Sequence, residues 1–78
     1  MLYPQLWYYF FVEKFSERLK ELRIEKDLSQ VQLAKETSLS KSALSYWEIG
    51  KRIPNAQAVI ILAQFFGVSA GYLLGIED

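Results

Sequence analysis

The sequence predicts an all-α fold, a compact bundle of five short helices around one core. The chain has 78 residues, of which 51% are hydrophobic, and this length suits a single small domain. Apolar side chains recur at steps of three and four residues, which is the period of an amphipathic helix. Ser or Asn precedes four of the expected helices, and these residue types commonly cap helix N-termini.

The five helices are expected over residues 15–26, 30–37, 41–49, 56–66 and 70–74. In the first helix, Phe15, Leu19 and Leu22 follow one face, and the charges between them are expected to form a solvated face. The second helix begins after the cap Ser29. Its expected buried side chains are Leu33, Ala34 and, in part, Val31.

The remaining three helices each lie between a polar cap and a glycine. The caps are Ser40, Asn55 and Ser69, and the glycines that stop the helices are Gly50, Gly67 and Gly75. Pro54 prevents the third and fourth helices from forming one continuous helix, because proline lacks the backbone donor that a helix interior needs. These local signals define all three elements.

The composition excludes several classes of function. Nine Lys and Arg residues balance nine Asp and Glu residues, so the chain is not a generally polycationic nucleic-acid binder. It contains no Cys and no His, which excludes zinc fingers, disulfide scaffolds and catalysis by those side chains, and we expect no metal and no cofactor. No apolar run reaches the ~18 residues of a membrane span, so we expect no membrane partner and a cytoplasmic location.

The most informative pattern lies in residues 28–55, where four basic and two acidic residues leave a net charge of +2. Only Ser38 and Leu39 separate the second helix from the third, so the two must cross steeply, as in a helix-turn-helix. On the third helix, one side carries Leu44, Trp47 and Glu48, and the other carries Ser42, Ser45 and Tyr46. The polar side is compatible with a plain solvated surface or with a face that enters the major groove of DNA.

Several motifs in this region occur together in one known family. The stretch LSQVQLAKETSLSKSALSYWEIGKRIPNAQAVIILAQFFGVSAGYLLG resembles the Xre-type helix-turn-helix family, which includes the phage lambda repressor and Cro. The resemblance covers about residues 15–76. It depends on LSQ and LA in the second helix, on W-E-x-G-K-R-x-P after the third, and on F-G-V-S and LLG near the end. It implies a sequence-specific DNA-binding domain of lambda-repressor-like fold that acts as a homodimer on a palindromic operator.

The resemblance also assigns residues to a DNA interface. The positions that match base-contacting residues are Ser40, Lys41, Ser42 and Tyr46. The positions that match backbone-contacting residues are Gln30, Ser45, Lys51 and Arg52. These types suit the roles, because Lys41 can donate to guanine, whereas Lys51 and Arg52 can neutralise phosphates without reading the sequence.

Two residues depart from the family pattern, Ser38 in the turn and Trp47 in the third helix, and a third residue, Glu48, needs a partner. Ser38 stands where the family usually has Gly in the turn, so either Ser38 adopts a left-handed conformation or the turn differs. Trp47 stands at a core position that the family generally gives to Ile or Leu. Glu48 falls on the core side, and Arg23 occupies the family position that pairs with it, so we expect a structural ion pair between them.

Residues 1–14, here called the N-terminal arm, lie outside the resemblance to the family, and residues 15–78 form the expected DNA-binding domain. The arm is compatible with a short strand or with a backward extension of the first helix. We favour a strand that pairs with a second chain, because an all-α domain has no sheet edge of its own. The expected dimer interface comprises Trp7, Tyr8, Tyr9, Phe10 and Phe11 of the arm, with Ile61 and Phe65 of the fourth helix.

The sequence therefore predicts a repressor-like, homodimeric regulator of transcription that binds double-stranded DNA through the third helix and has no catalytic residues. Its expected origin is a bacterium or a phage. The alternative function is a protein-interaction module with the same fold, such as an antitoxin or a partner-binding subunit. Salt dependence separates the two functions, since counterion release makes DNA binding fall steeply with salt.

Overall fold

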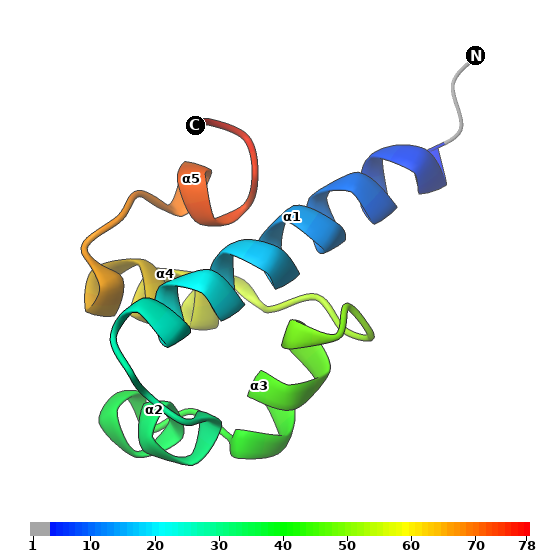
Figure 1. Cartoon of the computed structure of the whole chain (residues 1–78). Helices are drawn as coiled ribbons and strands as arrows, with labels where there is room; N and C mark the ends of the chain where they lie inside the picture. The colour runs from blue at the N-terminus through cyan, green and yellow to red at the C-terminus, as the bar shows by residue number, and fades with distance from the viewer. Residues whose placement is uncertain (1–3) are drawn as a thin grey trace.

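The computed structural model describes residues 4–78, which form an all-helical bundle (Figure 1). The helices are α1 Pro4–Glu25, α2 Gln30–Thr37, α3 Lys41–Glu48, α4 Ala56–Phe66 and α5 Ala70–Leu73. Within residues 4–78 there is no strand, so the all-α prediction is confirmed. Figure 1 shows α1 running diagonally across the molecule, with its N-terminal half projecting past the other helices.

Every helix contributes to one core. The fully buried large side chains are Phe15 and Leu19 of α1, Leu33 of α2, Leu44 of α3, Leu62 of α4 and Leu73 of α5. Trp47 packs the edge of its ring against Phe15, with 6.2 Å between the ring centroids, so the core accommodates the larger ring at this position. The helix α1 supplies two of these side chains and packs mainly against α3 and α5.

The local signals for helix boundaries are largely confirmed. Each expected N-cap accepts a hydrogen bond from a backbone N–H three residues on, and these caps are Ser29, Ser40, Asn55 and Ser69. The expected ends of three helices are one residue too late, because α1 ends at Glu25 and because Ile49 and Leu74 are caps rather than helical residues. The expected partial burial of Val31 is also wrong, since 55% of its surface is exposed.

The largest correction concerns the N-terminal arm. From Pro4 onwards it is helical and continues into α1 without a break, so the expected strand is wrong and the alternative, an extended first helix, is right. Residues 1–3 of the arm lie outside the described residues. Elongating an existing helix is much easier than nucleating a new element, and proline is tolerated in a first turn. A strand also needs a partner edge, which this all-helical chain does not supply.

The turn between α2 and α3 uses a left-handed residue. Ser38 has φ 60° and ψ 23°, so it adopts the conformation that glycine usually supplies at the end of a helix. Gly67 fills the corresponding position after α4 with φ 68°, and a Cβ built on it would meet no atom within 4 Å. The two positions share this backbone conformation, but it strains Ser38 and does not strain Gly67, which has no Cβ.

We expect Ser38→Gly to raise the free energy of unfolding by ~0.5–1 kcal/mol, since the relief of left-handed strain exceeds the entropy cost of glycine. Gly67→Ser is the matched reverse change, and we expect it to lower stability by a similar amount. Urea unfolding monitored by circular dichroism measures both. Destabilisation by Ser38→Gly would contradict this account of the turn.

Candidate nucleic-acid interface

The helices α2 and α3 lie together at one end of the molecule and form a helix-turn-helix (Figure 1). Leu33 anchors α2 in the core and Leu44 anchors α3. Thr37, which is buried at the end of α2, donates to the Leu33 carbonyl over 2.7 Å and accepts from the Leu39 N–H over 3.3 Å. These bonds satisfy the backbone at the turn, so the angle between the two helices is held from inside the domain.

The helix α3 has one buried face and one exposed face. Leu44, Trp47 and Glu48 are buried, whereas Lys41 and Ser42 are exposed. The two-sided pattern inferred from the sequence is therefore present. Near its start, the exposed face carries one long cationic side chain, Lys41, beside the short polar Ser42.

Ser40 has a structural task as well as an expected DNA contact. Its hydroxyl oxygen accepts a hydrogen bond from the Ala43 N–H over 3.1 Å and so caps α3. A hydroxyl both donates and accepts, so the hydrogen of Ser40 remains free to donate outwards. The next residue, Lys41, is the first of the helix and is exposed, so a negatively charged partner can reach it.

Tyr46 and Arg52 form a pair that the sequence analysis did not predict. The Arg52 guanidinium lies 4.8 Å from the centroid of the Tyr46 ring. The chain after α3 turns back at Gly50, and the Lys51 N–H donates to the Tyr46 carbonyl over 2.9 Å, which brings Arg52 above the ring. Gly50 was the expected stop of the third helix, but that signal alone does not place Arg52 over the ring.

Gln30 and Ser45, both expected at the DNA backbone, contact each other. The Ser45 hydroxyl donates to Gln30 Oε1 over 2.7 Å, and Gln30 Nε2 donates to Glu48 Oε1 over 3.1 Å. The Gln30 side chain thus connects the first residue of α2 to two residues of α3. Sequence reasoning missed this bridge because it assigned Ser45 and Glu48 to opposite sides of the helix, whereas residues three apart are neighbours on a helix surface.

Arg23 and Glu48 lie together as an ion pair in the interior. Arg23 Nε is 2.6 Å from Glu48 Oε2 and Nη2 is 2.8 Å from Oε1, which is a two-bond arrangement. Arg23 Nη1 also donates to the Leu28 carbonyl over 2.7 Å. The side chains retain only 13% and 3% of their accessible surface. Hydrogen bonding to Glu48 raises the pKa of Arg23 and the attraction of the carboxylate adds to this, whereas burial opposes both.

The remaining expected interface residues lie outside this region. Trp7, Tyr8, Tyr9 and Phe10 are exposed on α1, and Phe11 is half-buried. Ile61 and Phe65 are both half-buried on α4, and the Lys26 ammonium lies 5.7 Å from the Phe65 ring. The structure therefore does not bring these two groups together within one chain, because the arm contacts the segment after α3 and the end of α5 instead.

Across residues 4–78, no group of three or more Asp, Glu, His or Cys side chains is placed to hold a metal ion. In the same part of the chain, no helix combines the length and the apolar character needed to cross a membrane.

Comparison with known proteins identifies related sequences. A family model described as helix-turn-helix matches residues 19–73. The HTH-type transcriptional activator BcrR of Enterococcus faecalis is 40% identical over 65 residues, which cover 83% of this chain and 32% of that protein. The uncharacterized HTH-type transcriptional regulator YobD of Bacillus subtilis is 33% identical over 64 residues, which cover 82% of this chain and 57% of that protein.

A phage protein is also similar. The cryptic phage CTXphi transcriptional repressor RstR of Vibrio cholerae is 33% identical over 60 residues, which cover 77% of this chain and 54% of that protein. The chain thus spans between a third and somewhat over half the length of these relatives. No solved structure matches the chain significantly.

We expect removal of either partner of the Arg23–Glu48 pair to destabilise the domain by ~3–5 kcal/mol, because the remaining charge is left buried without compensation. The variants are Glu48→Gln and Arg23→Met, and thermal or urea unfolding measures the loss. The double variant Arg23→Met/Glu48→Met is the control and should recover most of the stability, since it buries no lone charge. Single variants as stable as the original chain would contradict the structural role of the pair.

Proposed function

Because the chain belongs to the helix-turn-helix family whose model matches residues 19–73, we propose that it is a sequence-specific DNA-binding regulator of transcription. Its similar proteins are named as regulators of transcription and not as enzymes. One of them is named an activator and another a repressor, so the proposal covers regulation in either direction. We place this activity in the bacterial cytoplasm, where operator DNA is found.

The observation that carries the proposal is the exposed face of α3 together with the cations beside it. Lys41 and Ser42 are exposed at its start, and Tyr46 follows one turn later with 40% of its surface exposed. The major groove admits an α-helix, and its base edges offer acceptors to Lys41 and thymine methyl groups to the ring of Tyr46. Acidic side chains would repel the phosphates, and the one acid of α3, Glu48, is buried.

Contacts to the DNA backbone complete the proposed interface. Lys51 and Arg52 are exposed directly after α3, where two positive charges can neutralise phosphates on the rim of the groove. Gln30 and Ser45 are half-buried and bonded to each other, so we assign them the role of holding α2 against α3 while their remaining hydrogen-bonding capacity faces the backbone. Ser40 is assigned a base contact through its free hydroxyl hydrogen.

We propose that the active form is a homodimer on a palindromic operator. A two-fold dimer presents two copies of α3, and half-sites are then spaced by about one turn of DNA, ~34 Å. A short α3 with few exposed long side chains offers few base contacts, so doubling the contacts is the simplest route to specificity. Selection of bound duplexes from a random pool tests this directly, because enrichment of an inverted repeat is the expected outcome.

The exposed aromatic residues of α1 favour a second candidate function, a module that binds another protein through an apolar surface. Salt distinguishes the two functions. Binding to DNA should weaken by orders of magnitude between ~50 and 200 mM salt, because each neutralised phosphate releases counterions. Association through apolar side chains should change little over the same range. A chain that selects no duplex and retains its partner at 200 mM salt would favour the second candidate.

Lys41→Ala and Lys51→Ala test the division between base and phosphate contacts. We expect Lys41→Ala to lower affinity for the best site by ~1–3 kcal/mol and to relax preference at one base pair, because it removes a contact to a base edge. Lys51→Ala should weaken binding to all sequences about equally and reduce the salt slope by about one. Competition assays on a panel of single-base variants measure both. Uniform loss in both variants would show that Lys41 does not read bases.

The contact between Arg52 and Tyr46 leads to a separate prediction. An exposed cation over an aromatic ring contributes ~0.5–1 kcal/mol, so Tyr46→Ala and Arg52→Ala should lower DNA affinity by less in combination than the sum of their separate effects. The control pair is Tyr46→Ala with Lys51→Ala, which should be additive. Affinities of the six forms for one selected duplex supply both cycles. Equal coupling in the two cycles would show that Arg52 does not position the ring.

A further inference from the structure

The N-terminal half of α1 exposes an unusually apolar surface. Its side chains, here called the arm surface, are Leu6, Trp7, Tyr8, Tyr9 and Phe10, and each keeps between 46% and 63% of its area exposed. A helix that is apolar on all sides is normally enclosed by other protein. This half of α1 projects from the bundle, so the rest of the chain does not enclose it (Figure 1).

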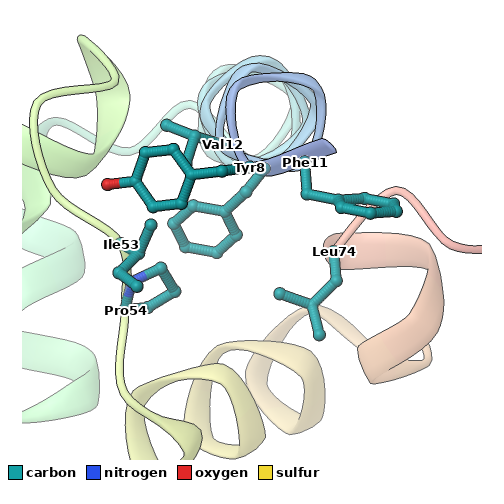
Figure 2. A pocket seen from close by; sticks show the side chains of 7 residues that line it. Tyr8, Phe11, Val12, Ile53, Pro54 and Leu74 are labelled. Carbon is teal, nitrogen blue, oxygen red and sulfur yellow. The ribbon is translucent and has the colours of Figure 1, made fainter. Parts of the chain in front are cut away.

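A hollow lies directly beside the arm surface. It has a volume of about 220 Å³ and an almost entirely apolar lining, from Tyr8, Phe11, Val12, Phe15, Ile53, Pro54 and Leu74. Figure 2 shows Tyr8 projecting from α1 over Ile53 and Pro54, while Phe11 projects towards Leu74 on the other side of the hollow. The hollow is smaller than the ~300–1,000 Å³ of typical small-molecule sites, so it suits a single protruding side chain.

We propose that the arm surface and this hollow are the contact between two copies of the chain, with an aromatic side chain of each arm seated in the hollow of the other. The proposal refines the proposed function and rests on it, because that function requires a dimer. The evidence for the contact itself does not depend on DNA binding. It concerns exposed apolar area at the N-terminal end of α1, away from the helix-turn-helix.

The available area reaches the lower limit for a specific dimer interface. A large aromatic side chain offers ~150–250 Å² when fully exposed, so five side chains that are about half exposed offer roughly 500 Å² per chain. Two copies would then bury about 1,000 Å², the lower bound for a specific interface, before the lining of the hollow is included. Ile61 and Phe65 are half-buried and add little, so the arm and the hollow carry the contact.

The chemistry of the arm also fits a second copy. Residues 1–12 contain no charged side chain, so two arms can approach without like-charge repulsion. Aromatic side chains are enriched and charges depleted at the centres of protein interfaces. The arm surface and the hollow adjoin on the same chain, which is the arrangement that a two-fold contact needs, because each patch then meets its own copy.

The position of the hollow connects this contact to the DNA-binding face. Ile53 and Pro54, which form one wall, directly follow Lys51 and Arg52. A Cβ built at Gly50 would lie 3.7 Å from Val12 Cγ1, so α1 also touches the exit from α3. A dimer closed here would therefore fix the separation of the two α3 helices, while the exposed faces of those helices remain free.

The test is the mass of the full chain in solution without DNA. The double variant Trp7→Lys/Tyr9→Lys changes two exposed side chains of the arm surface. The matched control is Ile24→Lys/Val31→Lys, which changes two similarly exposed aliphatic side chains near the end of α1 and the start of α2, away from the arm. Light scattering over a concentration series gives the dimer dissociation constant, and circular dichroism verifies that each chain is folded. We expect a dimer for the unchanged chain and the control, and a dissociation constant raised at least ~100-fold for the arm variant.

Three outcomes would overturn the proposal. They are a monomeric unchanged chain, an arm variant that dimerises as tightly as the control, and an open-ended aggregate rather than a dimer. A monomer that binds vesicles of anionic lipid would show that the arm surface meets a membrane instead. Failure of the proposed function is a separate result. It would appear as the absence of salt-dependent duplex binding by the unchanged chain, whether that chain is a monomer or a dimer.

Discussion

The buried carboxylate of Glu48 is the interaction on which the arrangement of the first three helices depends. It accepts two hydrogen bonds from Arg23 of α1 and one from Gln30 of α2, while its own backbone carbonyl accepts from the Ser16 hydroxyl over 2.6 Å. A buried charge is tolerated only when its hydrogen-bonding capacity is filled. One residue of α3 thus specifies its position relative to both α1 and α2.

This constraint acts directly on the face that we propose for DNA. A helix held at Glu48 near its end and capped by Ser40 at its start cannot rotate about its own axis without breaking those bonds. The exposed positions between them are therefore presented at a defined angle. Beyond the end of α3, Arg52 stacks on Tyr46, which extends the ordered surface past the helix. Recognition then depends on side chains whose supports are already in place.

The helix α1 combines two environments in a single element. Its C-terminal half supplies Phe15 and Leu19 to the core and Arg23 to the buried ion pair. Its N-terminal half is more apolar but largely exposed. Val12 and Phe15 mark the transition, since both are buried and both line the hollow beside the arm. Any partner at the arm would therefore contact the same side chains that hold α1 in the core.

The sequence by itself determined the starts of α2 to α5 and most of the inward-facing residues, because N-caps and helical spacing act within a few residues. Ser29, Asn55 and the buried Leu44 follow from such local rules. Only the tertiary structure decided the conformation of the arm, since its apolar run is compatible with strand or helix and the adjoining helix extended through it. The bonds of Gln30 and the stacking of Arg52 likewise depend on how separate segments meet. Local patterns carry no information on these contacts, because the distances involved are set by packing of the whole chain.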